Sequence, residues 1–472
     1  MNLFAKKLPD PRAAQALRRC LTAWDLTFLG IGNMIGAGIF VLPGVVAATQ
    51  AGPAIILSFV VAGIACVFVA LSYAELAASV GGCGGGYGYS YAAFGELPAW
   101  IVGWITASAA GFSVAAVANG WSGYVANAMA PFGIGLPEYL TKGPAAGGLV
   151  NLPAVLIVLV LMTVLIAGVK QSAKLNSVIV AIKLVAIALF VGVALFHIRG
   201  ELWQPFLPFG WFDHTPDGKT VGVLAGAAIV SFAYMGFQNV SVAAEEAQNP
   251  QRDVPIGTLA AVIVCALLYI AVSGLLTAIV PYQSLNVSSP IAYALLQIGV
   301  NWGSALVAVG IIAGLTSPML ITYYAGTRML FAMARDGLLP PVFCRVSAKT
   351  QIPVNSTIVC GILIASMAGL IPLGDLAQIS SLGRLTEFTL VCLGVIVLRL
   401  TKPDMHRPFK APGGFILPVL GMLSCTALIT FLPLATLAGF AFYLAVGLAV
   451  YFGYAARRNR ATPSQTPDEI VA

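Results

Sequence analysis

Apolar runs of roughly 18 to 25 residues recur along this chain of 472 residues, and about 20 consecutive apolar residues are what a helix needs to cross a lipid bilayer. Charged residues make up only 9% of the chain, whereas a soluble domain carries about 25%. The chain therefore lacks the polar side chains that would cover a soluble surface. These features predict an all-α integral membrane protein that lies in the lipid bilayer.

Division of the apolar runs at proline, glycine and charged residues predicts twelve membrane-spanning helices. The predicted spans are 25–48, 53–77, 97–129, 152–169, 175–197, 221–244, 256–280, 303–333, 354–371, 376–399, 415–433 and 437–456. With both termini inside, nineteen of the 24 Lys and Arg residues fall on the inner side and three on the outer side: Lys142, Arg199 and Lys219. Because basic residues concentrate in cytoplasmic loops, we expect a multi-pass protein of the inner (plasma) membrane with both termini cytoplasmic.

Glycines interrupt the first and the sixth span. The first span contains GNMIGAGIF (32–40), with Gly32, Gly36 and Gly38 inside an otherwise apolar run. The sixth span contains SFAYMGFQN (231–239), where a glycine and polar residues again lie halfway across. Two interrupted helices at matching places in two sets of five spans are typical of an inverted-repeat transporter. The sequence thus predicts a 5+5 inverted repeat, with helices 1 and 6 unwound at mid-membrane and helices 11 and 12 added.

An interrupted helix leaves backbone groups that hydrocarbon cannot satisfy, at a cost of several kcal/mol each, and a bound solute can satisfy them instead. A helix that restarts near Ile39 directs N–H groups toward the break, which suits a carboxylate. Carbonyl groups at the helix ends near Ile35 and Tyr234 suit an ammonium group, so the site fits an amino acid. Close helix packing through the GxxxG pattern of Gly32 and Gly36 is the alternative, but it does not explain the second interruption.

Seven motifs follow one another along the chain in a characteristic order. They are GAGIFVLPG (36–44), GWITASAAGFSVAAVANGWSGY (103–124), NSVIVAIKL (176–184), FAYMGFQN (232–239), AEEAQNPQRDVP (244–255), TRMLFAMARDGLLP (327–340) and RPFKAPGG (407–414). In these motifs the chain resembles the amino acid–polyamine–organocation (APC) superfamily of permeases, and most closely the cationic amino acid transporter (CAT) branch with its bacterial relatives. The resemblance covers nearly all of 20–410. It implies the LeuT-type fold, with the substrate held between helices 1, 3, 6, 8 and 10.

The predicted fold divides the chain into four parts. They are a cytoplasmic N-terminal segment (1–24), a ten-helix inverted-repeat transport core (25–400), helices 11 and 12 (401–456) and a cytoplasmic C-terminal tail (457–472).

The interrupted spans and the resemblance together predict the residues that bind the substrate. They are Ile35, Gly36, Ala37, Gly38, Ile39, Ala109, Ser113, Phe232, Ala233, Tyr234, Gly236, Phe237 and Met319. The CAT branch usually has a glutamate where this chain has Ala109, so this position favours a neutral over a basic substrate. The small residues around Ala109 predict a small to medium, apolar L-amino acid.

Lys183 lies in the middle of the fifth predicted span, where a charge costs about 2.5–3.5 kcal/mol or more. Burial away from water favours the neutral form of a lysine. In the resembled family, the lysine at this position stands near the break in the first helix, where sodium-driven relatives bind their ion. We therefore predict that Lys183 couples proton movement to transport. The alternative is a lysine that pairs with carbonyl groups and only braces the bundle.

Other charged residues have two interpretations each. Arg384 and Glu387 are spaced i,i+3 in the tenth predicted span and can pair on one helix face. That pair either faces the bundle as a structural pair or places Glu387 near the substrate site or a proton path. Glu245 and Glu246, at the cytoplasmic end of the sixth span, are predicted to belong to an inside gate, and a solvated loop is the alternative.

The predicted function is secondary active transport of L-amino acids, as proton-coupled uptake of neutral amino acids. Amino acid exchange, or transport of cationic amino acids by the same fold, is the alternative. We do not expect an enzyme, because the spans hold no carboxylate dyad and no histidine away from their ends. The eight cysteines are scattered singly, so we expect no metal site and no cofactor. No nucleic acid and no obligatory protein partner are expected.

Overall fold

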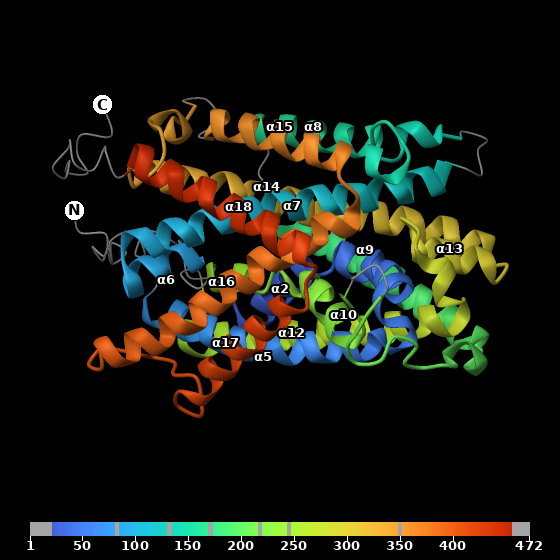
Figure 1. Cartoon of the computed structure of the whole chain (residues 1–472), viewed down its shortest axis with the longest axis horizontal. Helices are drawn as coiled ribbons and strands as arrows, with labels where there is room; N and C mark the ends of the chain where they lie inside the picture. Colours follow the sequence, from blue (N-terminus) through green and yellow to red (C-terminus); the bar gives the residue numbers. More distant parts are fainter. Residues whose placement is uncertain are drawn as a thin grey trace.

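The computed structural model describes residues 21–80, 85–129, 135–168, 173–215, 220–242, 247–347 and 352–455. Most of these residues are helical, and Figure 1 shows the helices side by side, with many of them running along the long axis of the molecule. The only paired strands in the described ranges are the two-residue strands β1 (Asp213–His214) and β2 (Thr220–Val221).

The first half of the chain, up to residue 242, forms ten α-helices and the 3₁₀ turn η8 among the described residues. They are α2 (Ala23–Met34), α3 (Ala37–Phe40), α4 (Leu42–Val46), α5 (Ile55–Ser79), α6 (Gly85–Phe94), α7 (Glu96–Met129), α8 (Leu152–Ile166), α9 (Ala173–Ala194), α10 (Val223–Val230), η8 (Ser231–Tyr234) and α11 (Gln238–Val242). The second half contributes α12 (Pro250–Ile279), α13 (Pro290–Gln297), α14 (Asn301–Arg335), α15 (Val354–Leu370), α16 (Leu373–Thr401), α17 (Ile416–Thr430) and α18 (Leu434–Val450).

Eight helical segments in the described part are long and apolar enough to cross a membrane. They are Leu42–Ser79, Glu96–Met129, Val178–His197, Val223–Ser241, Pro250–Ile279, Asn301–Arg335, Leu373–Thr401 and Leu434–Ala455. Three shorter apolar helices, α8, α15 and α17, accompany them. Each of the twelve predicted spans overlaps helical residues. The prediction of an integral membrane protein built from helices is therefore confirmed.

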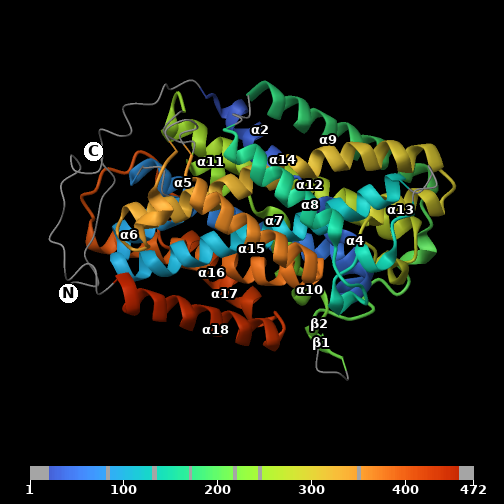
Figure 2. The ribbon, with the colours of Figure 1, turned by 90° about the horizontal axis from the view of Figure 1, so that it is seen from above.

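The packing places α7 in the middle of the bundle, where it contacts α14 and α16. α12 packs against α2 and α5, and α9 packs against α14. Figure 2 shows α18 along the outside of the bundle. Of the apolar 18-residue stretch in Leu434–Ala455, which contains α18, only 11% is buried. The segments α2–α4 and η8–α11, which contain the glycine motifs, thus lie among long helices that can hold them in place.

A buried ion pair joins α5 to α16 at one end of the bundle. Both oxygens of Glu75 accept hydrogen bonds from the Arg399 guanidinium, one of them from Nε at 2.9 Å. The backbone N–H of Ala411 donates to the same carboxylate at 2.8 Å, and Arg407 Nε lies 3.9 Å from it. Since the side chains of Glu75 and Arg399 are 2% and 5% exposed, each charge depends on the other for its compensation.

We expect Glu75→Gln to lower the midpoint of thermal unfolding of the detergent-solubilised protein by many degrees. The substitution removes the carboxylate and leaves the Arg399 charge buried, and breaking a buried pair in this way costs roughly 3–5 kcal/mol. A matched control is Glu138→Gln, which breaks the exposed pair of Glu138 and Lys142 (2.9 Å). The control should leave the midpoint almost unchanged. Equal midpoints for the two variants would contradict a stabilising role for Glu75.

Candidate functional site

The first break lies between α2 and α3. Helix α2 ends at Met34, Ile35 is extended (φ −72°, ψ 98°), and α3 begins at Ala37. Gly36, just before α3, has φ −150° and ψ −144°. The helix thus restarts at Ala37, two residues earlier than the restart near Ile39 that the sequence predicts. The first N–H groups of α3 have no intrahelical acceptor.

The second break lies between η8 and α11. The turn η8 ends at Tyr234, and Met235 is extended (φ −65°, ψ 134°). Gly236 has φ +127°, a conformation that glycine adopts much more readily than other residues. Its N–H donates to the side-chain oxygen of Gln238 at 2.9 Å. The glycine of this motif is therefore required by the conformation of the break itself.

The two breaks pack directly against each other. A Cβ atom on Gly38 would collide with the Cα and Cβ atoms of Ala233. A Cβ atom on Gly236 would lie 2.9 Å from the Cβ atom of Asn33, which is closer than real Cβ contacts come. Gly38 with Ala233, and Gly236 with Asn33, are each about 200 positions apart in the sequence. Each pair can meet only because one of its two residues is a glycine.

Tyr269 of α12 lies within hydrogen-bond distance of one carbonyl group from each break. Its hydroxyl oxygen lies 2.9 Å from the carbonyl oxygen of Met34 and 2.7 Å from that of Ala233. Because the hydroxyl has one proton, it donates to one of these carbonyls at a time. Tyr269 is fully buried, so it links α2 to η8 in a place that water does not reach.

Lys183 of α9 reaches the end of α2 from another side. Its Nζ atom donates to the carbonyl oxygens of Gly32 at 2.9 Å and Ile35 at 3.0 Å, and the side chain has no exposed surface. Its aliphatic part packs against Gly314 of α14. Lys183 thus holds the Ile35 carbonyl group that the sequence analysis assigns to a bound ammonium group.

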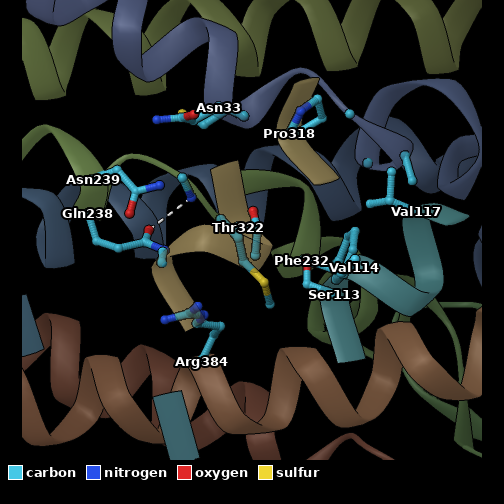
Figure 3. Close-up of a pocket in the computed structure, with 17 residues that line it drawn as sticks. Asn33, Ser113, Val114, Val117, Phe232, Gln238, Asn239, Pro318, Thr322 and Arg384 are labelled. Carbon is cyan, nitrogen blue, oxygen red and sulfur yellow. Dashed lines mark hydrogen bonds between the residues drawn. The ribbon is translucent and has the colours of Figure 1, made fainter. Parts of the chain in front are cut away.

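A cavity of about 50 Å³ lies between the two breaks and the helices α7, α14 and α16. It is lined by Asn33, Met34, Gly36, Ala37, Gly38, Ser113, Val114, Val117, Phe232, Met235, Gly236, Gln238, Asn239, Pro318, Thr322, Ala325 and Arg384. Figure 3 shows Asn33 and Pro318 on one side of it and Arg384 on the other. The cavity is much smaller than the sites of drug-sized ligands, which are about 300–1,000 Å³, so it suits a small solute.

Six of the residues that the sequence predicts to bind substrate line this cavity: Gly36, Ala37, Gly38, Ser113, Phe232 and Gly236. The other seven are buried near it without lining it: Ile35, Ile39, Ala109, Ala233, Tyr234, Phe237 and Met319. The side chains of Tyr234 and Phe237 have structural partners. The Tyr234 hydroxyl donates to the carbonyl oxygen of Phe59 at 2.7 Å, and the Phe237 ring packs edge-on against Tyr73.

Several lining residues are absent from the predicted set. Asn33 and Gln238 stand inside the two glycine motifs, so their polarity within an apolar span was the available signal. Pro318 lies inside α14, and a proline in a long apolar run marks a place where the backbone is irregular. Thr322 lies one helical turn after Pro318, on the same face of α14. The proline could therefore have indicated that Thr322 also faces the site.

Arg384 and Glu387 form a buried ion pair on α16. The Nη1 atom of Arg384 donates to Oε2 of Glu387 at 2.6 Å, and the two side chains are 8% and 2% exposed. The other carboxylate oxygen, Oε1, accepts a hydrogen bond from the Tyr73 hydroxyl at 2.8 Å. The predicted pairing is therefore present, and it is Arg384 that lines the cavity.

Glu245 and Glu246, the predicted gate residues, lie outside the described residues. Within the described ranges, no group of three or more His, Cys, Asp or Glu side chains could hold a metal ion.

The sequence matches known transporters over nearly its whole length. It is 42% identical over 464 residues to the methylthioribose transporter of Bacillus subtilis (strain 168), an alignment that covers 97% of this chain and 99% of that protein. It is 41% identical over 469 residues to the branched-chain amino acid permease BcaP of the same strain, with the same coverage of 97% and 99%. The cationic amino acid transporter 4 (vacuolar) of Arabidopsis thaliana is 36% identical over 391 residues, which cover 82% of this chain and 64% of that protein.

The profile of the amino acid permease family matches residues 21–463. This range contains both glycine motifs and every residue that lines the cavity. The resemblance to the APC superfamily is thereby confirmed, and the chain belongs to the amino acid permease family of membrane transporters.

Proposed function

We propose that this chain takes up neutral L-amino acids of small to medium size, together with protons, across the plasma (inner) membrane. Amino acid transport follows from the family to which the chain belongs. The observation that supports the binding site is the cavity between two broken helices, where backbone and small side chains form much of the wall.

We also propose the LeuT-type architecture in its full form. Twelve helices cross the membrane as a 5+5 inverted repeat in 25–400 plus two helices in 401–456, and the segments 1–24 and 457–472 are cytoplasmic. The segments α2–α4 and α10–α11 support this proposal, because both are broken in the middle and they pack on each other at the breaks. Broken helices at corresponding places in two repeats form the binding sites of such transporters.

The ends of an amino acid bind to backbone groups in this proposal. Its carboxylate accepts hydrogen bonds from the N–H groups at the start of α3, where Gly36, Ala37 and Gly38 line the cavity without large side chains. Its ammonium group donates to carbonyl groups at the end of η8, near Tyr234. A carbonyl oxygen has two lone pairs, so the Phe232 carbonyl of η8, which accepts from the N–H of Met235 at 3.1 Å, can also serve a cargo in the cavity that Phe232 lines.

Neutral cargo is favoured by the charge of the cavity. Arg384 is the one charged side chain among its described lining residues, so a basic amino acid would place a second positive charge beside it. Ala109, at the position where the CAT branch usually has a glutamate, is buried, and its carbonyl oxygen accepts a hydrogen bond from Ser380 at 2.9 Å.

Lys183 is the proposed proton carrier. Its charged form is attracted to the negative end of the α2 dipole and to two carbonyl oxygens there. Loss of the proton weakens that attraction, so the end of α2 becomes easier to move. Sodium-driven relatives in the resembled family bind their ion near this break, so an ammonium group beside it favours protons over sodium. We further propose that Glu245 and Glu246 contribute to the inside gate.

Two related functions remain as alternatives within the same fold. One is amino acid exchange or the transport of cationic amino acids, and the name of the Arabidopsis relative gives cationic amino acids for that protein. The other is uptake of methylthioribose, because the relative of that name is 42% identical over 97% of this chain. Methylthioribose therefore belongs in any uptake panel.

We expect purified protein in liposomes to take up labelled neutral amino acids at rates at least about ten times those of arginine and lysine, because a second buried positive charge is costly. Replacement of external sodium by choline should not change the rate. Empty liposomes serve as the control. Preferred uptake of arginine or lysine would refute the neutral assignment, and exclusive uptake of methylthioribose would replace amino acids as the cargo.

Lys183→Met should abolish accumulation driven by an inward proton gradient, because methionine keeps the apolar packing and removes the titrating group. Uptake of the same neutral amino acid should then reach only equilibrium and lose its dependence on external pH. Exchange against internal unlabelled amino acid shows whether the variant still binds and moves its cargo. Undiminished accumulation would remove Lys183 from the coupling mechanism.

Gly38→Ala should strongly reduce uptake, because the new methyl group collides with Ala233 and separates the two breaks. Gly192→Ala is the matched control, since this exposed glycine of α9 has no atom within 4 Å of an added Cβ. The control should transport as well as wild type. Similar uptake by both variants would show that close contact between the breaks is not needed.

A further inference from the structure

Arg384 is an unusual residue for the wall of a buried cavity. It comes from α16, its side chain is 8% exposed, and it lines the space between the two breaks. Figure 3 shows the guanidinium group rising from α16 into this space, below Gln238 and Thr322. A guanidinium group carries five N–H donors and stays charged in proteins, so it needs several acceptors when it is buried.

The charge of Arg384 is already compensated on the side away from the cavity. Its Nη1 atom donates to Oε2 of Glu387 at 2.6 Å. The second oxygen of Glu387 accepts from the Tyr73 hydroxyl at 2.8 Å, and Tyr73 packs against Phe237 and Phe388. Glu387 does not line the cavity. The pair is therefore oriented, with the carboxylate among aromatic side chains and the cation toward the cavity.

One donor of Arg384 has no acceptor. The Nε atom is buried and has no hydrogen-bond partner among the described residues. The side-chain oxygen of the neighbouring Gln238 accepts from the N–H of Gly236 at 2.9 Å and is not a partner of this Nε atom. A buried donor without an acceptor is costly, so the protein around Arg384 leaves part of its hydrogen-bonding capacity unused.

Arg384 lies on the opposite side of the cavity from Asn33 and Pro318, which mark the first break. Gly36 packs beside Pro318, with 3.5 Å between an added Cβ and the Cγ atom of the proline. Figure 3 shows Pro318 and Asn33 across the cavity from Arg384. A cargo whose carboxylate lies at the first break therefore turns its side chain toward Arg384.

We propose that Arg384 determines specificity by donating a hydrogen bond to an oxygen atom in the side chain of the cargo. The preferred class is then neutral amino acids with a side-chain hydroxyl or amide group, which replaces the purely apolar class that the sequence analysis predicts. This proposal rests on the function proposed above. Because Arg384 and Glu387 form a neutral pair, a basic or an acidic side chain would each add an uncompensated charge to this buried site.

Threonine and valine provide the sharpest test, because they have nearly the same shape and differ by a hydroxyl in place of a methyl group. In liposomes containing the wild-type protein, we expect the ratio of Vmax to KM for threonine to exceed that for valine by about tenfold or more, since a site built to donate a hydrogen bond discriminates strongly against an analogue without the acceptor. Asparagine and leucine form a second pair of similar size.

The matching variant is Arg384→Met combined with Glu387→Gln. It removes both charges together, so that no carboxylate is left buried without a partner. We expect valine uptake to persist and the preference for threonine to fall by about tenfold. The control is Tyr73→Phe, which removes a hydrogen bond to Glu387, keeps both charges and should keep the preference for threonine.

Three results would overturn the proposal. The first is a wild-type protein that transports valine as well as or better than threonine, a measurement that needs no variant. The second is a double variant whose preference stays within about twofold of wild type. The third is an equal loss for both amino acids, which would place the guanidinium group on their shared part. These results leave amino acid transport intact, whereas wild-type protein that transports no amino acid refutes the proposed function and this inference with it.

Discussion

The site in this structure depends on how two broken helices satisfy their backbone groups away from water. In a bilayer each unpaired peptide group costs several kcal/mol, so a chain that breaks two helices must supply partners for them. Tyr269 supplies one proton that either of two carbonyl groups can accept, one from each break, and Lys183 donates to two carbonyl groups at the end of α2. Neither side chain lines the cavity. They hold the breaks from outside, and the backbone that faces inward is left for a cargo.

The same two breaks are coupled by their close packing. Gly38 leaves no room for a side chain against Ala233, and Gly236 leaves none against Asn33. Interiors that are packed this tightly transmit displacements to their neighbours. A movement at the end of α2 therefore reaches η8. Lys183 and Tyr269 donate hydrogen bonds to the backbone at these breaks, so their hydrogen bonds would change in such a movement. This links the proposed proton carrier to both halves of the proposed binding site without direct contact between Lys183 and the cargo.

The positions of the helices and of the glycine motifs could be predicted from the sequence, because span length, hydropathy and glycine are local properties. The partners of the breaks could not. Tyr269 meets Met34 across 235 positions of sequence, and no periodicity in either helix indicates that pairing. The i,i+3 spacing of Arg384 and Glu387 did indicate their ion pair. It could not say which of them faces the cavity, because the rotation of α16 is set by its packing against α7 and α17.

The two buried cations near the site differ in what compensates them, and this difference separates the roles that we propose for them. Lys183 is held by neutral carbonyl dipoles, so that loss of its proton leaves no countercharge behind. Arg384 is held by the carboxylate of Glu387, and a guanidinium group keeps its proton in proteins. A proton carrier must be able to become neutral without stranding a partner, which Lys183 can do and Arg384 cannot. A specificity residue must instead present the same charge and the same donors at all times, and that is the property of Arg384.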